Sequence, residues 1–150
     1  MIQIEHSIQI NRPVHEVFAF LADPRNFPTW QTGVVQSTIT SSGPIGLGTT
    51  FDEEVKIVAW KVRTACEVTQ YELDKKMCFK AMSKPIAYAG QFTFEKSGDG
   101  TRLNVFGAAQ LRGLWRLAGP LFGSEIKKET AKEMVKMKEV VESGTPAHEP

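Results

Sequence analysis

The sequence has very little of what several protein classes require. It contains only two cysteines, Cys66 and Cys78, which are too few for a disulfide framework and lack the spacing of a zinc or redox motif. They are expected to be free thiols, buried or half-buried, in a reducing compartment. No stretch approaches the roughly 18 apolar residues of a membrane span, and the first ten residues lack the basic start of a signal peptide. These absences predict a soluble, cytoplasmic protein.

A strong charge of either sign is also missing. Eighteen basic and seventeen acidic residues leave a net charge of +1, so the basic excess that binds nucleic acid or an anionic membrane is absent. The three histidines, His6, His15 and His148, belong to no metal-binding motif, and the glycines between Gly43 and Gly48 lack the spacing of a dinucleotide fingerprint. We expect no metal, no cofactor and no nucleic-acid partner.

Hydrophobic patterning predicts the elements of the first two thirds of the chain. Apolar and polar residues alternate from Ile2 to Ile10, as in a half-buried strand. Asn11 and Asp23 each precede a proline and a helical pattern, so we expect two short helices, the first ending near Ala22 and the second near Trp30. Turn residues then separate six further expected strands, at 34–40, 50–58, 61–71, 77–83, 87–95 and 101–111.

The last third of the sequence predicts one long helix. Ser124 is a suitable N-cap, and the helix is expected to reach Glu142. Glu–Lys pairs, among them Glu133 with Lys136, are expected on its solvent side. An apolar stripe follows the other side: Ile126, Thr130, Met134, Met137 and Val141.

Together these elements predict an α+β fold, with a single domain at 1–144 and a disordered tail at 145–150. The short links between consecutive strands require an antiparallel sheet. One helix, about 10–12 Å across, is narrower than seven strands spaced about 4.8 Å apart, so the sheet must curve round the helix. The two short helices then close one end, and a cavity remains between sheet and helix unless large side chains fill it.

Several segments resemble the helix-grip superfamily (SRPBCC). They are INRPVHEVFAFLADPRNFPTW at Ile10–Trp30, GLGTTF at Gly46–Phe51, VTQYE at Val68–Glu72 and FTFEKSGDGTRL at Phe92–Leu103. The superfamily includes START lipid-transfer domains, the major birch-pollen allergen and bacterial polyketide cyclase/dehydrase-like proteins, and the sequence resembles this last branch. The resemblance covers Ile4 to about Val141. It implies a helix-grip fold, in which a seven-stranded curved antiparallel sheet surrounds a long C-terminal helix and two short helices follow the first strand.

For function, the resemblance implies an internal cavity that holds a small hydrophobic ligand, such as a lipid, a polyketide or an aromatic compound. Some relatives bind or transport the ligand, and a minority catalyse cyclisation or dehydration. The matching motifs mark turns, caps and packing, so they leave enzymatic activity open. The alternatives are a binding or transport protein, a polyketide cyclase/dehydratase-type enzyme with acid–base residues in the cavity, and a module whose last helix signals occupancy. A monomer and a homodimer are compatible with each of them.

Three residues are candidates for acid–base catalysis in such a cavity. His6 lies on the apolar face of the first strand, where a histidine is either a base near neutral pH or a satisfied core residue. Glu53 shares one strand face with Phe51, so it is either an inward carboxyl that needs a partner or a proton, or a residue at the rim. Tyr88 aligns with Phe92 and is either a hydroxyl that positions the ligand or a tyrosine that reaches solvent.

Apolar and aromatic side chains are the candidate ligand contacts. Phe27 and Trp30 lie beside the expected mouth, and Trp115 and Phe122 flank Gly119-Pro120; each pair is either a cover over the ligand or part of the core. Gln70 is expected on the inward face of its strand, where an amide would orient a ligand. The full set of expected ligand contacts is Phe27, Trp30, Phe51, Gln70, Tyr88, Phe92, Trp115, Phe122, Met134 and Met137.

Overall fold

The structure is a computed structural model of the chain, and it describes residues 2–57, 59–82 and 86–144. The tail predicted at 145–150 lies outside the described residues. In chain order the elements are β1 (Ile2–Ile10), α1 (Val14–Leu21), the 3-10 helix η1 (Pro24–Thr29), β2 (Val34–Ile39), β3 (Thr50–Ile57), β4 (Trp60–Glu72), β5 (Lys76–Met82), β6 (Ile86–Ser97), β7 (Gly100–Leu111), the 3-10 helix η2 (Gly113–Ala118) and α2 (Gly119–Glu142).

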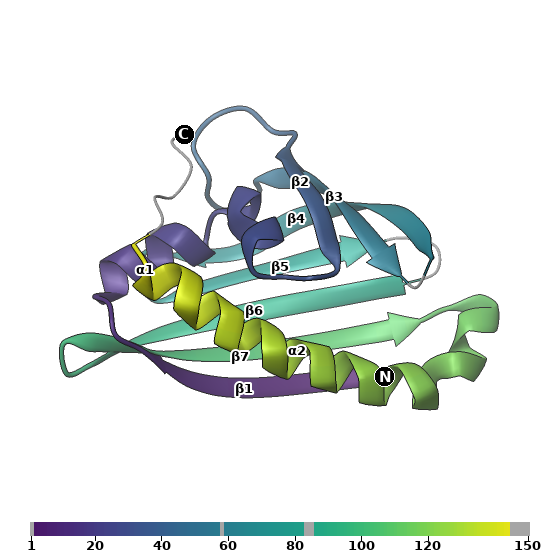
Figure 1. The fold of residues 1–150 in the computed structure, drawn as a ribbon. Coiled ribbons are helices and arrows are strands. Elements are labelled where there is room, and N and C mark those ends of the chain that lie inside the picture. The colour runs from purple at the N-terminus through teal and green to yellow at the C-terminus, as the bar shows by residue number, and fades with distance from the viewer. Residues whose placement is uncertain (1, 58, 83–85, 145–150) are drawn as a thin grey trace.

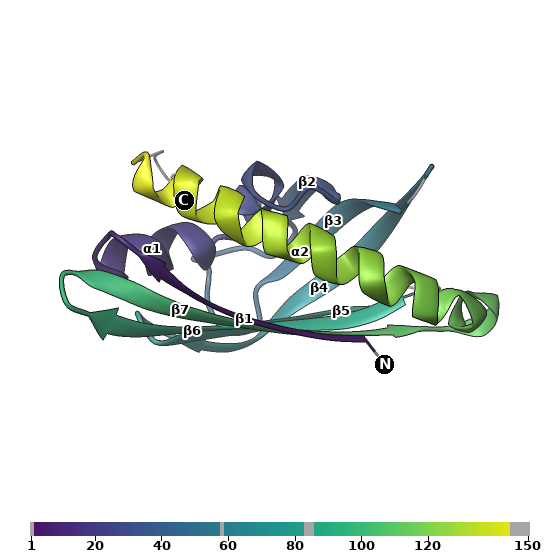
Figure 2. The same ribbon diagram turned by 60° about the horizontal axis from the view of Figure 1, so that its bottom comes forward.

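The strands form one antiparallel sheet in the order β1-β7-β6-β5-β4-β3-β2. From β2 to β7, each strand pairs with the next strand in the sequence. The first strand, β1, lies at the edge of the sheet and pairs with β7, from Ile2 opposite Ala109 to Ile10 opposite Thr101. The sheet is curved, and α1, η1 and α2 all lie on its concave side, with α2 running across it (Figures 1 and 2). The predicted seven-stranded curved sheet around a C-terminal helix is therefore confirmed.

Two helices begin at different places from those predicted. No side chain caps α1, which begins directly after Pro13, and Asn11 instead donates its backbone N–H to Oε1 of Glu142 at 2.8 Å. The long helix α2 begins at Gly119, ahead of the predicted cap Ser124. Its second residue, Pro120, is compatible with the first helical turn because the N–H that proline lacks has no partner inside a helix there.

The C-terminal end of α2 is hydrogen-bonded to the end of β1 and to the residues that directly follow this strand. Arg12 donates from Nη2 to the carbonyl oxygen of Glu142 at 2.9 Å, and the Lys138 ammonium donates to the carbonyl oxygen of Gln9. Lys138 also pairs with the Glu142 carboxylate at 3.2 Å. These contacts fix the helix over β1.

Among the helices that the structure describes, none is long and apolar enough to cross a membrane.

Aromatic rings fill the part of the concave side that lies beneath η1. The fully buried Phe27 packs against the rings of Trp30, Phe51, Phe79 and Phe92, with centroids between 5.4 and 6.2 Å apart. Edge-to-face and tilted contacts of this kind stabilise a core beyond the area that they bury. Large side chains therefore fill the concave side here, and a pocket lies further along the sheet.

A candidate ligand pocket beneath the long helix

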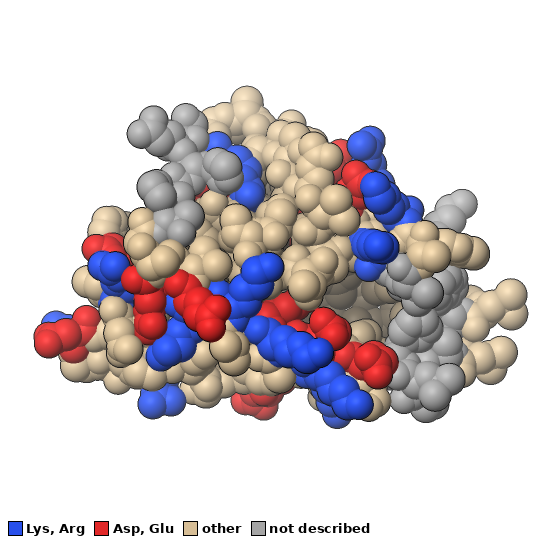
Figure 3. Space-filling model, in the orientation of Figure 1, with Lys and Arg blue, Asp and Glu red and all other residues tan. Residues whose placement is uncertain are grey.

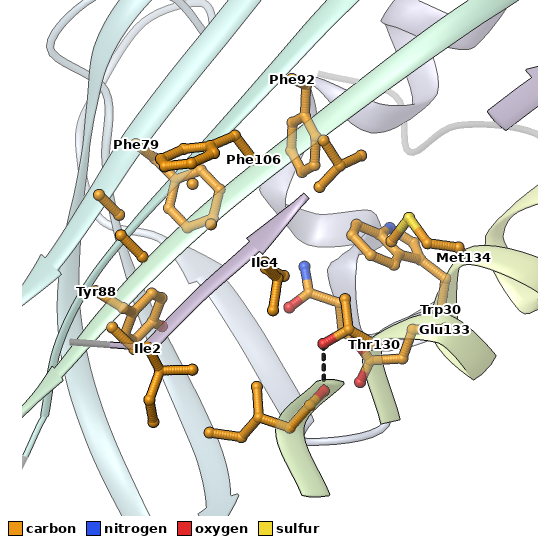
Figure 4. Close-up of a pocket in the computed structure, with 18 residues that line it drawn as sticks. Ile2, Ile4, Trp30, Phe79, Tyr88, Phe92, Phe106, Thr130, Glu133 and Met134 are labelled. Atoms are coloured by element: carbon orange, nitrogen blue, oxygen red, sulfur yellow. Dashed lines mark hydrogen bonds between the residues drawn. The ribbon is translucent and has the colours of Figure 1, made fainter. Parts of the chain in front are cut away.

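A pocket of about 230 Å³ lies between α2 and the concave side of β1, β6 and β7 (Figure 4). In the space-filling view, acidic and basic side chains follow the exposed side of α2, and the surface is hollowed between this helix and the strands above it (Figure 3). The lining residues come from β1, the segment after η1, β5, the paired strands β6 and β7, and α2. In that order they are Ile2 and Ile4; Trp30 and Gln31; Phe79; Tyr88–Gly90, Phe92 and Val105–Ala109; and Ile126, Thr130, Glu133 and Met134.

Two paired glycines form the floor of the pocket. Gly90 on β6 lies directly opposite Gly107 on β7, and the row continues to Phe79 on β5 and to Ile4 on β1. A Cβ on Gly90 would lie 2.5 Å from Cε1 of Phe79, and one on Gly107 would lie 2.9 Å from Cγ1 of Ile4. Phe79 and Ile4 therefore lie directly over the two glycines, which leave room for these side chains to pack low against the sheet beneath the pocket. The next row adds another small residue, Ala109, between Ile2 and Tyr88.

A buried tyrosine–glutamate pair lies behind one wall of the pocket. Tyr88 lines the pocket, and its hydroxyl donates a hydrogen bond to Oε2 of Glu53 at 2.5 Å. The tyrosine side chain reaches Glu53 across β5 and β4, where its row carries the small residues Ala81 and Cys66. Glu53 is 1% exposed, and its other oxygen, Oε1, has no hydrogen-bond partner among the described residues.

The surroundings of this pair favour its uncharged state. Burial raises the pKa of Glu53 to about 7, although the Tyr88 hydrogen bond acts in the opposite direction. Burial, followed by the negative charge of Glu53, holds the pKa of Tyr88 far above its usual value, so the phenol remains a donor. Burial also raises the pKa of the nearby Cys66 thiol to about 12. A carboxyl that gains and loses a proton near neutral pH is therefore linked to the pocket wall through a neutral phenol.

A second carboxyl, Glu133, lies in the lining itself. Its Oε1 accepts hydrogen bonds from the backbone N–H of Thr32 at 3.0 Å and from the Thr32 hydroxyl at 2.8 Å. The expected pair with Lys136 on the solvent side is therefore wrong for Glu133, which is half-buried. Its spacing could have indicated this, because Glu133 follows Thr130 by three positions and Ile126 by seven, at the edge of the apolar stripe.

The structure brings four of the expected ligand contacts together in the lining: Trp30, Tyr88, Phe92 and Met134. Phe27, Phe51 and Met137 are buried in the core beside the pocket and do not line it. The side chains of Trp115 and Phe122 lie outside the described part of the structure. Phe79 lines the pocket although the sequence did not single it out.

The inward orientation predicted for Gln70 is wrong. The pairing of β4 with β5 shifts between Val68, which lies opposite Phe79, and Gln70, which lies opposite Cys78. One extra residue in a strand reverses the faces of those that follow it. Gln70 is consequently exposed, while Val68 is buried. Both cysteines are free, with Cys66 buried and Cys78 half-buried, as predicted.

His6 is half-buried on β1 and does not meet the other acid–base candidates. It lies opposite Val105 and shares its strand face with Ile4, but it is not part of the pocket lining. Four strands lie between β1 and β3 in the sheet order, and the hydrogen-bond partner of Glu53 is Tyr88. Within the described ranges, no three His, Cys, Asp or Glu side chains are grouped so that they could hold a metal ion.

The sequence profile of a protein family described as "Polyketide cyclase / dehydrase and lipid transport" matches residues 1–142. The chain belongs to this family. No curated protein matches the chain in sequence. The resemblance to polyketide cyclase/dehydrase-like proteins is thereby confirmed.

Several solved structures share this fold at low sequence identity. The protein TTHA0849 from Thermus thermophilus superposes with a TM-score of 0.79 at 16% identity, over 96% of this chain and 99% of that one. A START superfamily protein from Mycobacterium smegmatis gives 0.73 at 13% identity, over 96% and 97%. The di-domain ARO/CYC BexL from the BE-7585A biosynthetic pathway gives 0.72 at 16% identity, over 97% of this chain and 48% of that one. At such identities the likeness shows the helix-grip fold.

Proposed function

We propose that this domain binds a small, largely apolar ring compound in the pocket beneath α2. The observation that carries the proposal is the pocket of about 230 Å³ with its mostly apolar lining. The paired glycines Gly90 and Gly107 let Phe79 and Ile4 pack low over its floor. A concave site with a mostly apolar lining and a few polar groups is typical of small-molecule binding. The family to which the chain belongs, described by polyketide cyclisation and lipid transport, supports the same class of ligand.

The size of the pocket favours a ligand with one to three rings. Its volume of about 230 Å³ exceeds the roughly 150 Å³ of an apolar cavity that holds benzene and falls below the roughly 300–1,000 Å³ of sites for drug-sized molecules. A bicyclic aromatic compound fits between these limits. A long-chain lipid or a tetracyclic polyketide would require α2 or the side chains around Trp30 to move.

Titration with the neutral fluorescent probe N-phenyl-1-naphthylamine tests this function. We expect enhanced emission that saturates at one probe per chain under native conditions. Ala109→Leu should weaken binding by at least about tenfold because its side chain enters the pocket, whereas Ala65→Leu, at an exposed position of β4, should leave binding unchanged. An emission signal that appears only during partial unfolding, or that both variants reduce equally, would contradict the proposal.

A second candidate function is acid–base catalysis on the bound compound, of the kind that a polyketide cyclase or dehydratase performs. The observation that favours it is the Tyr88–Glu53 pair, because a carboxyl with a pKa of about 7 exchanges protons readily at neutral pH. Tyr88 would contact the ligand, and Glu53 would supply or remove the proton through the phenol. A small poly-β-ketone is the substrate class on which such a pair would act.

An assay for cyclisation of a synthetic triketide, monitored by its change in absorbance, distinguishes ligand binding alone from acid–base catalysis. If the pair is catalytic, Glu53→Gln should lower turnover by about 10²–10⁴ while probe affinity changes by no more than a few-fold. Glu129→Gln is the control, since it also removes a carboxylate, but one that is exposed, lies outside the pocket lining and leaves the Tyr88–Glu53 pair intact. Equal turnover in the wild type and Glu53→Gln would restrict the domain to binding.

A further inference from the structure

The described lining of the pocket carries an acidic side chain but no basic one. Among the described residues that line it, none is a lysine, an arginine or a histidine, although the whole sequence carries eighteen lysines and arginines. Glu133 is the one carboxyl among these described lining residues. A ligand that enters therefore meets apolar surface, a few neutral polar groups and a potential negative charge.

Glu133 differs from its neighbours along α2 in what it contacts. Glu129 pairs with Lys132 at 3.6 Å, and Glu142 pairs with Lys138 at 3.2 Å. Glu133 forms no ion pair within the described part of the chain, and its hydrogen bonds come from uncharged groups, the hydroxyl and backbone N–H of Thr32 and the backbone of Gly33. Burial raises the pKa of Glu133 above its usual value, while the Thr32 hydrogen bonds act in the opposite direction. The negative charge at this position is consequently uncompensated.

Trp30 supplies an independent polar feature of the same pocket. It is 3% exposed and lines the pocket, and its indole Nε1 has no hydrogen-bond partner among the described residues. An unpaired buried N–H costs free energy that a ligand oxygen or π-system would recover. Trp30 and Glu133 lie together at the α2 side of the pocket in Figure 4. Trp30 thus adds an unpaired donor to the acceptor that Glu133 supplies.

We propose that the pocket selects uncharged or cationic ring compounds that donate a hydrogen bond to Glu133, and that it excludes carboxylates and phosphates. This inference rests on the proposed binding function. An anion placed here would lose its hydration without gaining a cationic partner, and it would also lie near the Glu133 charge. An alkylammonium or a phenol would gain an acceptor instead. Free fatty acids are therefore poor ligands of this domain.

Competition among matched naphthalene compounds tests the selection. Each compound displaces N-phenyl-1-naphthylamine at pH 8: 1-naphthylmethylamine is the cation, 2-naphthol the neutral donor and 1-naphthoate the anion. With the wild type we expect the amine and the naphthol to bind at least about tenfold more tightly than the carboxylate. Glu133→Gln should weaken the amine and strengthen the carboxylate, which brings their affinities to within a few-fold of each other.

Glu129→Gln is the control. It removes the charge of a carboxylate that lies one helical turn from Glu133, is exposed and pairs with Lys132. It should leave the order of affinities as in the wild type. If naphthoate competes as well as the amine in the wild type, or if both variants change the order equally, the charge selection is wrong while binding itself stands. If the neutral probe does not bind at all, the proposed function fails instead.

Discussion

The hydroxyl of Tyr88 lies 2.5 Å from Oε2 of Glu53, although β4 and β5 separate their two strands in the sheet. The contact is possible because the row that Tyr88 crosses carries the small side chains of Ala81 and Cys66. Glu53 is thereby held in an apolar environment with one oxygen bound and the other unpaired among the described residues. The first two predictions concern this pair.

Glu53 should make the stability of the domain depend on pH. Its pKa is about 7 in the folded protein and 4.5 ordinarily, so the folded protein keeps a proton that the unfolded chain releases between these values. The free energy of unfolding therefore falls as pH rises from about 4.5 to 7, by roughly 3 kcal/mol from this group. Glu53→Gln should lack this contribution. Urea denaturation of both proteins from pH 4.5 to 8.5 measures it, and a constant difference between them would contradict the prediction.

Tyr88→Phe should destabilise the protein more at high pH than at low pH. Without the phenol, an ionised Glu53 loses the hydrogen-bond donor that the described residues give it, so its pKa should rise further. We expect a loss of about 1–3 kcal/mol at pH 8 and a smaller loss at pH 5, where the carboxyl is protonated. Tyr71→Phe, at the other tyrosine of the sequence, is the control and should show no such difference between the two pH values. A loss that is equal at both pH values would argue against the pairing.

The two floor glycines should respond differently to alanine. A Cβ on Gly90 meets the Phe79 ring at 2.5 Å, and one on Gly107 meets Cγ1 of Ile4 at 2.9 Å. Gly90→Ala should cost about 1–3 kcal/mol because the ring is held by the aromatic core. Gly107→Ala should cost less, since its Cβ would approach Ile4 less closely, Ile4 is only half-buried, and alanine loses less backbone entropy than glycine. Thermal and chemical denaturation of the two variants compare them, and equal losses would show that Ile4 is held as firmly as Phe79.

Trp30→Phe should remove a preference for ligands with a hydrogen-bond acceptor. The variant keeps an aromatic ring beside Phe27 and Phe92 but lacks the unpaired Nε1 donor. We expect the affinity for 1-acetylnaphthalene to fall by roughly two- to tenfold relative to that for 1-ethylnaphthalene, which has no acceptor. Isothermal titration with both compounds measures the ratio. An unchanged ratio would mean that the indole N–H does not reach the ligand.

Local patterns in the sequence determined most of the fold. Alternation at period two and spacing at three to four residues depend only on the chain itself, and turn residues mark where strands end, so the predicted strands match the observed ones to within about two residues. The curvature of the sheet also followed from the sequence, because a single helix cannot cover seven flat strands. Parity along β3 correctly placed Glu53 on the inward face, where it is buried.

Only the tertiary structure decided where the pocket lies and which residues reach it. Gly90 and Gly107 form a floor because the register of β6 and β7 places them opposite each other, and register is a relation between segments. The shift between Val68 and Gln70 reversed the predicted face of Gln70 for the same reason. The contacts of Glu133 with Thr32 and of Glu53 with Tyr88 join residues 101 and 35 positions apart. No local sequence pattern predicts these long-range contacts, because they depend on how the whole sheet curves beneath α2.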